Sequence, residues 1–397
     1  MRRQGRISAA AVLTGLAIVA GACGSSKTSS STTTTTAAST SSSAAVTTAA
    51  PATTQAPAAT TAAPATTLAP QKVGLLYDIT GRGDKSFNDA AAAGLDKAKA
   101  EFGVVAAEST PVKADGSDRT SRLDTVVADG NKLVIGVGFL WNAAITKGSQ
   151  DHAGTQFLLI DDVSMLPGPD GKMFTADDVA PANVRDATFA EEQGSYLVGV
   201  AAALKTKTKK VGFVGGVQIS LIQKFEAGFT AGVHSVDATI KVDAKYISQP
   251  PDFTGFNNAA KGQEIAKAMY GAGEDVVYAA AGASGTGVFQ AAKGASTAAK
   301  KVWGIGVDSD QYNTVGADLQ AYVLTSMVKH VEVAVYEAIR DFVGGKYTDD
   351  HKVYDLKAGG VGYATSGGFV DDIKDKLETA KAAIIAGTIV VPTAPGK

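Results

Sequence analysis

The chain has 397 residues, of which 45% are apolar and 19% charged, and 37 lysines and arginines against 39 aspartates and glutamates give a formal net charge of −2. This length suits two lobes with separate cores, and the absence of a basic excess argues against a nucleic-acid-binding protein. The single cysteine, Cys23, excludes an intramolecular disulfide framework, a thiolate zinc cluster and an iron–sulfur site.

Residues 1–22 have the pattern of a bacterial export signal, with three arginines, an apolar stretch and small residues before Cys23. The apolar stretch has about 14 residues, fewer than the ~20 that a membrane-spanning helix needs. A cysteine directly after small residues resembles a lipoprotein processing site, at which Cys23 is acylated. The alternative is an ordinary signal peptide followed by an unrelated cysteine.

Residues 23–70 then form a segment of serine, threonine, alanine and proline with almost no large apolar side chains. Such a composition buries too little surface to offset the entropy of the chain, so we expect a disordered stalk, with O-glycosylation left open. The residues that carry chemistry are therefore expected within residues 71–397.

From Lys72 onward, short apolar runs alternate with helical patterns. This alternation is typical of parallel β-sheets covered by helices on both faces. A single sheet would need nearly ten strands, so we predict an α/β protein with two doubly wound sheets in two lobes. Strands are expected at 72–77, 133–137, 156–160, 211–216, 240–247, 275–280 and 302–307, and helices at 87–102, 142–151, 222–233, 263–270 and 288–299.

Polar and aromatic residues follow the first predicted strand. The segment from Asp78 to Asp89 contains acids, a hydroxyl group, an amide and an aromatic ring. Asp84 or Ser86 is a candidate N-cap of the next helix, but capping does not explain Phe87 in a polar cluster. An exposed ring at this place can stack on a ligand ring, with about 1–3 kcal/mol for a nucleic acid base.

Acids also follow later strands, at Asp161 and Asp308, and Lys329 lies further along the chain. Acids in this position are commonly helix caps. However, ligands of open α/β sheets lie beyond the carboxyl ends of the strands, and a carboxylate accepts two hydroxyl hydrogen bonds. Asp308 and Lys329 would thus suit a sugar or ribose, if the two are close in space.

Residues 281–287, Ala-Gly-Ala-Ser-Gly-Thr-Gly, follow another strand and open a helix. Their glycine spacing fails the dinucleotide fingerprint, so NAD binding is rejected. A tight turn that brings backbone close to a ligand is the simpler interpretation.

Seven ordered motifs make the sequence resemble the basic membrane protein (PnrA-like) family of purine-nucleoside-binding lipoproteins, which serve ABC transporters. The motifs lie at 84–88, 211–216, 224–229, 256–262, 281–287, 306–311 and 323–329. The resemblance runs from about Lys72 to Gly368. It implies a type I periplasmic-binding-protein fold, in which two α/β lobes close on a ligand.

The resemblance also implies a set of ligand-binding residues. Phe87 would stack on the base, with Phe256 on the opposite face and Phe225 or Tyr278 as alternatives. Asp161 would address the edge of the base, and Asp308 with Lys329 would hold the ribose. Asp78 and Asn88 would line the cleft, and Gly282 would let backbone approach the ligand.

The resemblance divides residues 71–397 into lobe 1, at about 72–186 plus 308–330, and lobe 2, at about 187–307 plus 331–397.

One departure from the family is a longer segment, 164–178, after Asp161. Its acids faintly suggest calcium but do not fit the EF-hand spacing, so a surface turn is expected. Because this segment lies just after Asp161, the resemblance does not determine which ligand the pocket selects.

The sequence thus predicts a solute-binding protein, not an enzyme, anchored by lipid to the extracytoplasmic face of the cell membrane. Its expected partners are a purine nucleoside and an ABC permease; no cofactor, metal or nucleic acid is expected. A sugar or amino acid on the same fold is one alternative, and a nucleoside-processing enzyme is another. The four histidines have no zinc spacing, and no G-x-S-x-G motif is present.

Overall fold

Two six-stranded β-sheets form the frame of the computed structural model, which describes residues 70–113 and 115–396. The predicted signal peptide, Cys23 and all but the end of the predicted stalk lie outside the described residues. The first sheet has the order β11-β5-β4-β3-β1-β2 and the second β12-β10-β9-β8-β6-β7. We call the two sheets with their helices lobe 1 and lobe 2.

All strands pair in parallel except β12, which is antiparallel to β10. The lobe 1 strands are β1 (Lys72–Leu76), β2 (Val105–Ser109), β3 (Leu133–Gly136), β4 (Gln156–Ile160), β5 (Val184–Phe189) and β11 (His351–Tyr354). The lobe 2 strands are β6 (Lys210–Val217), β7 (Lys241–Ser248), β8 (Val276–Ala280), β9 (Trp303–Asp308), β10 (Val323–Lys329) and β12 (Val361–Tyr363). The predicted fold class, two parallel α/β sheets of the type I periplasmic-binding-protein kind, is confirmed.

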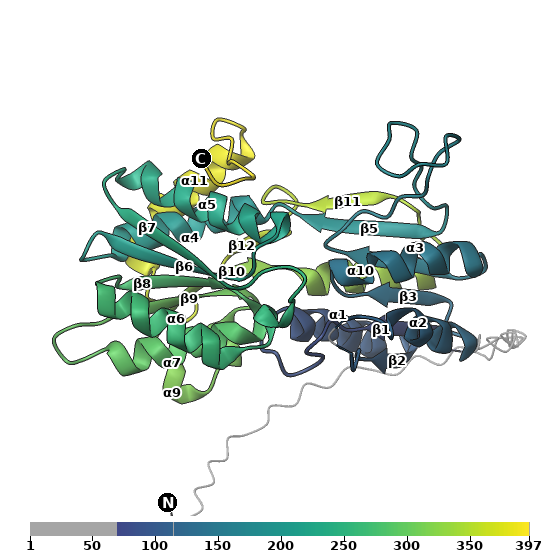
Figure 1. Cartoon of the computed structure of the whole chain (residues 1–397), viewed down its shortest axis with the longest axis horizontal. Coiled ribbons are helices and arrows are strands. Elements are labelled where there is room, and N and C mark those ends of the chain that lie inside the picture. The colour runs from purple at the N-terminus through teal and green to yellow at the C-terminus, as the bar shows by residue number, and fades with distance from the viewer. Residues whose placement is uncertain (1–69, 114, 397) are drawn as a thin grey trace, which may run out of the picture. The chain divides into compact units, whose positions relative to one another are not determined.

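Helices cover both faces of each sheet (Figure 1). In lobe 1 they are α1 (Phe87–Phe102) with α10 (Val331–Val343), and α2 (Arg119–Ala128) with α3 (Asn142–Asp151). In lobe 2 they are α4 (Glu191–Lys205) with α5 (Ser220–Val236), α6 (Ala259–Ala272) with α7 (Gly285–Ala295), the short α8 (Gln311–Thr314) and α9 (Ala317–Gln320), and α11 (Lys374–Ile385). No helix of the described part is long and apolar enough to cross a membrane.

Alternate residues of the central strands enter different cores. In β1, Val73 and Leu75 pack in the same core as Leu95 of α1, whereas Leu76 packs with Leu123 of α2. All five leucine and valine side chains named here are fully buried. Because successive strand residues point to opposite faces, the apolar runs of the sequence reflect burial on both sides.

The helices α4 and α5 are in unusually close contact through glycines. A Cβ atom on Gly199 would lie 2.2 Å from the carbonyl oxygen of Phe229, and one on Gly228 would lie 2.1 Å from that of Glu192. Any larger residue would push the helices apart. This close approach matters for the site because Lys224 on α5 contacts Glu191 at the start of α4.

The predicted limits of the lobes are wrong in their last part. Residues 308–330 were expected in lobe 1, but β10 pairs with β9 in the lobe 2 sheet. Residues 331–354 were expected in lobe 2, but α10 packs against α1 and β11 pairs with β5, both in lobe 1. The chain passes from lobe 1 to lobe 2 after β5, returns after β10 and crosses again between β11 and β12. Strand alternation alone cannot show which sheet a strand joins, because strand pairing is non-local.

Candidate functional site

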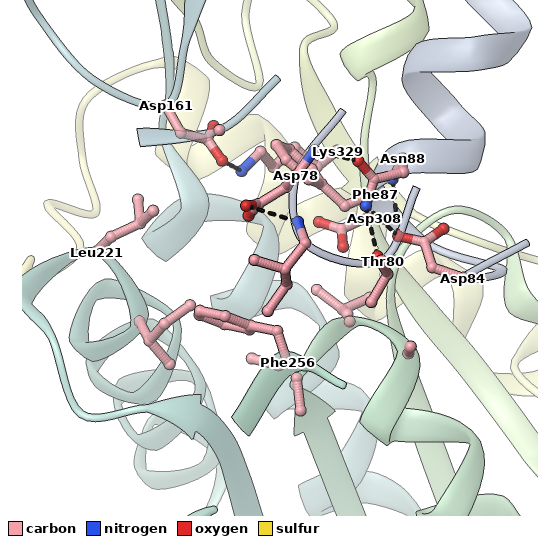
Figure 2. Close-up of a pocket in the computed structure, with 18 of the residues that line it drawn as sticks. Asp78, Thr80, Asp84, Phe87, Asn88, Asp161, Leu221, Phe256, Asp308 and Lys329 are labelled. Carbon is pink, nitrogen blue, oxygen red and sulfur yellow. Dashed lines mark hydrogen bonds and ion pairs between the residues drawn. The ribbon is translucent and has the colours of Figure 1, made fainter. Parts of the chain in front are cut away.

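A pocket lies between the lobes at the carboxyl ends of β1, β4, β8, β9 and β10 (Figure 2). Its empty space, open mouth included, is about 590 Å³, within the range of roughly 300–1,000 Å³ usual for small-molecule sites. The eight residues that the sequence suggested all line it: Asp78, Phe87, Asn88, Asp161, Phe256, Gly282, Asp308 and Lys329. Other lining residues include Thr80, Asp84, Gly138, Phe139, Leu221, Phe225 and the segment 280–283.

The start of α1 is organised by Asp84. Its carboxylate accepts hydrogen bonds from the backbone N–H groups of Ser86, Asn88 and Asp89, at 3.0, 2.8 and 3.1 Å. Of the two candidate caps, Asp84 therefore satisfies the free N–H groups of the helix, and Ser86 makes no side-chain cap bond. Phe87, the first residue of the helix, is thereby held at the pocket.

Asn88 positions the turn before the helix. Its amide oxygen accepts the backbone N–H of Asp78 at 2.9 Å, and its amide nitrogen donates to Thr80 Oγ1 and Asp84 Oδ2 at 2.7 and 2.9 Å. The Asn88 amide thus joins the end of β1 to the start of α1. This explains how residues ten positions apart line one wall.

Asp78 is a buried carboxylate that lies next to the guanidinium of Arg119. Its Oδ1 accepts the N–H of Ile79 at 2.8 Å and lies 3.5 Å from Arg119 Nη2. Burial raises the pKa of Asp78 to about 6, and the Arg119 charge opposes that rise. Gly138, with φ of 102°, leaves room here, since a Cβ atom on it would lie 3.2 Å from Asp78 Oδ2.

Lys329 is the buried cation of the site. Its side chain is 2% exposed, and Nζ lies 2.7 Å from Asp161 Oδ2 and 3.5 Å from Glu191 Oε1. Nζ also lies 4.9 Å from the centre of the Phe87 ring and 5.0 Å from that of Phe189. Burial acts to lower the pKa of Lys329, but the surrounding carboxylates outweigh burial and raise it above its ordinary range.

Lys329 and Asp308 were expected to lie close together, but they form no direct ion pair. Both line the pocket, but the ion pairs of Lys329 are with Asp161 and Glu191, and Asp308 acts on it only through its nearby charge. Asp308 Oδ2 instead accepts the hydroxyl of Ser86 at 2.7 Å. The two groups therefore present an acid and a cation to one cavity without neutralising each other directly.

The two pocket acids Asp161 and Asp308 share an unusual backbone. Their φ angles are 70° and 64°, in the left-handed region that non-glycine residues rarely adopt. Such strain concentrates at functional sites. Burial raises the pKa of Asp161 to about 7 and that of Asp308 to about 6, against the pull of Lys329 in both cases. Asp161 Oδ1 is buried and has no hydrogen-bond partner among the described residues.

Aromatic side chains reach the pocket from both lobes. Phe87 comes from lobe 1 and Phe256, on the 3₁₀ turn Thr254–Phe256, from lobe 2. Of the alternatives to Phe256, Phe225 lines the pocket but is only 2% exposed, and Tyr278 is fully buried with its hydroxyl 3.2 Å from Ser195 Oγ. The partly exposed Phe256 is therefore better placed to meet a ligand.

The carboxyl end of β8 brings backbone to the pocket. Gly282 has φ of 55°, and the 3₁₀ turn Gly282–Ser284 leads directly into α7. A Cβ atom on Gly282 would lie 3.4 Å from the carbonyl oxygen of Phe256, so the positive φ rather than crowding favours glycine.

Comparison with known proteins decides the family. Residues 71–394 match the family described as ABC transporter substrate-binding protein PnrA-like. The chain belongs to this family. It is 37% identical over 337 residues to the ABC transporter nucleoside-binding protein BmpA of Lactococcus lactis, covering 81% of this chain and 89% of that protein. It is 30% identical over 318 residues to an uncharacterized lipoprotein of Pyrococcus horikoshii, covering 79% and 72%.

Solved structures agree with this assignment. An ABC transporter solute-binding protein of Aeropyrum pernix matches with a TM-score of 0.68 and 28% identity, over 81% of this chain and 94% of that one. Members of the PnrA-like family are the substrate-binding proteins of ABC transporters. The pocket between the lobes is accordingly the place where a small-molecule substrate is expected.

The segment 164–178, longer than expected of the PnrA-like family, lines no part of this pocket. Leu166 and Val179 form an isolated bridge at its base, and Asp177 and Asp178 accept backbone N–H groups of the same loop. Within residues 70–113 and 115–396, no group of histidines, cysteines and acids is arranged to hold a metal ion. These contacts are those of a surface turn.

Among the site residues that sequence reasoning missed, three matter most. Glu191 is 1% exposed and contacts Lys329, Arg119 contacts Asp78, and Phe139 lines the pocket. Glu191 follows β5 after one residue, Ala190, so the signal that singled out Asp161, an acid after a strand, was present there too. The strand itself was missed because Arg185 and Asp186 interrupt its apolar residues.

Proposed function

We propose that this protein captures a purine nucleoside in the pocket between its lobes and delivers it to the permease of an ABC transporter. The observation that carries the proposal is the pairing of aromatic side chains from both lobes with buried carboxylates in one cavity. A nucleoside offers the matching groups: a flat base, N–H donors at its edge and a ribose with hydroxyls. The nucleoside-binding relative in Lactococcus lactis supports the same ligand class.

Phe87 and Phe256 would hold the base. The ammonium of Lys329 lies over the Phe87 ring, so a base would stack on the opposite face of that ring. Stacking of a base on an aromatic side chain contributes about 1–3 kcal/mol. Phe256 would cover the base from lobe 2, which makes tight binding dependent on closure of the lobes.

The acids would hold the polar ends of the nucleoside. Asp161 Oδ1, buried and without a partner among the described residues, would accept an N–H group from the base edge. Asp308, with one oxygen on Ser86, would accept ribose hydroxyls, and Lys329 would donate to ribose oxygens. Hydrogen bonds to charged groups contribute roughly 1.5–3 kcal/mol each, so loss of one acid should be measurable.

Calorimetry with nucleosides, bases, sugars and amino acids tests the proposal. We expect micromolar or tighter binding of inosine, guanosine or adenosine, with no product after overnight incubation. The change Phe87→Ala should weaken nucleoside binding at least tenfold and leave the melting temperature of the ligand-free protein nearly unchanged. Binding of sugars or amino acids alone would overturn the nucleoside proposal, and turnover of a nucleoside would indicate an enzyme.

We also propose that Cys23 carries a lipid that holds the protein at the membrane. Its place after small residues supports this, as does the lipoprotein relative in Pyrococcus horikoshii. The change Cys23→Ser should move the protein from the membrane fraction to the soluble fraction. Retention of the variant in the membrane fraction would contradict the anchor.

A further inference from the structure

Two segments next to the pocket join the lobes directly. The lobe 1 segment, 84–87, is the turn that leads into the first residue of α1. The lobe 2 segment, 307–314, runs from the last two residues of β9 through α8. Their contacts across the lobes are Ser86 Oγ to Asp308 Oδ2 at 2.7 Å and to the Val307 carbonyl at 3.1 Å, Ser309 Oγ to the Ser86 carbonyl at 2.9 Å, and Gln311 Nε2 and Thr314 Oγ1 to the Lys85 carbonyl, both at 3.0 Å. We call these hydrogen bonds the clasp.

Gln311 is built to serve this contact. It is fully buried, and its Oε1 accepts the backbone N–H of Val307 at 3.1 Å, which leaves Nε2 to donate to lobe 1. Gly306 makes room for it, since a Cβ atom there would lie 2.6 Å from Gln311 Oε1. A buried amide with both ends bonded has its orientation determined by its partners.

Lys85 is the acceptor on the other side. Its φ is 60°, and this left-handed turn carries the carbonyl that both Gln311 and Thr314 reach. Its own N–H donates to Asp89 Oδ2 at 3.0 Å, within lobe 1. The turn is therefore held by one lobe through its N–H and by the other through its carbonyl.

The clasp adjoins both ligand-facing groups. Phe87 directly follows Ser86, and Asp308 is itself the acceptor of the Ser86 hydroxyl. The hydrogen bonds connect residues more than 220 positions apart in the sequence, on elements of different sheets. They exist only while the lobes are together, so separation of the lobes must break them.

We propose that Gln311, Thr314 and Ser86 are positioning residues that hold the lobes closed and keep Asp308 in register with Phe87. The effect on ligand retention rests on the proposed function; the effect on closure does not. Loss of clasp bonds lowers the closed fraction of the protein. Because a ligand that needs the closed state has its apparent affinity reduced by that fraction, the clasp sets how long a nucleoside is held.

Spin labels across the lobes test closure without any ligand. We would label the full chain at Asp129→Cys in lobe 1 and Lys267→Cys in lobe 2, both exposed, in a Cys23→Ser background. The variants are Gln311→Glu, which replaces the donor by an acceptor facing the Lys85 carbonyl, and Thr314→Val, which removes a hydroxyl at a half-buried position. Each should shift the distance distribution toward longer distances.

The matched control is Gln320→Glu. Gln320 Nε2 also donates to a backbone carbonyl, that of Tyr312 at 3.0 Å, but both residues lie in lobe 2. This variant should keep the wild-type distance distribution. A ligand-free wild type without a short-distance population, clasp variants that match the wild type, or a control that shifts equally would each overturn the clasp.

Stopped-flow release of inosine tests the effect on the ligand. For Thr314→Val we expect the dissociation rate to rise at least threefold with a smaller change in the association rate, and for Gln320→Glu no change in either. Equal rates in wild type and Thr314→Val would contradict the role in retention. If inosine and the other nucleosides fail to bind the wild type, the proposed function fails, whereas the spin-label distances still decide whether the clasp holds the lobes.

Discussion

The two lobes have the same frame but different charges at their strand ends. Strand by strand, β1 to β5 and β11 of lobe 1 occupy the same places in the sheet order as β6 to β10 and β12 of lobe 2. In both lobes the third strand leads through a 3₁₀ turn, Phe139–Trp141 or Gly282–Ser284, into a helix. Because the frames match, differences at equivalent strand ends show what each lobe adds to the site.

The fourth strand of each sheet leads to an aspartate with positive φ, Asp161 after β4 and Asp308 at the end of β9. Each aspartate bonds to the other lobe, Asp161 to Lys329 and Asp308 to Ser86, both at 2.7 Å. One acid is therefore held by a buried cation and the other by a hydroxyl. After the fifth strands the charges are opposite: Glu191 follows β5 at the start of α4, Lys329 ends β10, and their side chains lie 3.5 Å apart.

The largest effect is expected from Lys329→Met, which removes the buried cation of the site. It leaves the buried acids Asp161 and Glu191 without the cation between them, and loss of one partner from a buried ion pair costs about 3–5 kcal/mol. We expect the free energy of unfolding of the ligand-free protein to fall by about that amount in urea denaturation, and nucleoside binding to be lost.

The exposed pair of Lys293 and Asp318, at 2.8 Å, supplies the control. Lys293→Met should change the free energy of unfolding by less than about 1 kcal/mol, because surface ion pairs contribute little. A similarly small loss for Lys329→Met would show that the buried acids are not held by this lysine.

The change Asp308→Asn isolates the acid that a hydroxyl holds. The amide removes the negative charge that would meet the ribose but leaves the fold intact, since no buried cation loses its partner. We expect nucleoside affinity in calorimetry to fall at least tenfold, with the melting temperature of the ligand-free protein unchanged or higher. The exposed Asp318→Asn should leave affinity unchanged. Undiminished affinity in Asp308→Asn would remove Asp308 from the proposed site.

Much of the fold could be predicted from local patterns. The limits predicted for α1, α3 and β4 agree with the structure because an apolar face or a short apolar run defines each of them. In contrast, α4 was missed because its residues are buried nearly all round and show no period. The lobe to which β10 and α10 belong depends on pairing with distant segments, which no local pattern contains.

The site follows the same division. Acids and aromatics at strand ends could be singled out because parallel strands bring their carboxyl ends to one edge. Their partners could not, because the contacts of Arg119 with Asp78 and of Glu191 with Lys329 depend on the packing of whole elements. The sequence therefore suggested which groups face the pocket, and the structure adds what holds them there.

The two aspartates with positive φ predict that the stability of the ligand-free protein depends on pH. In the folded protein the pKa is about 7 for Asp161 and about 6 for Asp308, against an ordinary 3.8. The folded state then binds more protons than the unfolded state between about pH 4 and 7, so ligand-free stability should fall as pH rises through this window. The melting temperature should be higher near pH 5 than near pH 7.5.

Nucleoside affinity should change in the opposite direction. If the donors of the ligand bind ionised carboxylates, binding must release the protons held at low pH, so affinity should rise by several-fold between about pH 5.5 and 7.5. In Asp308→Asn both dependences should weaken, because one of the titrating groups is gone. Affinity that falls with rising pH would mean that a protonated acid donates to the ligand.

The smallest effect is expected from Tyr278→Phe, which removes a buried hydroxyl of lobe 2 and keeps the ring. Tyr278 packs in a buried aromatic cluster with Phe213 and Phe229 and is not among the pocket residues. Loss of its hydroxyl removes the hydrogen bond with Ser195, worth about 0.5–1.5 kcal/mol of stability. Nucleoside affinity should stay within twofold of wild type, whereas Phe256→Ala should weaken it at least tenfold in the same calorimetric assay. Undiminished affinity in Phe256→Ala would remove Phe256 from the proposed stacking pair.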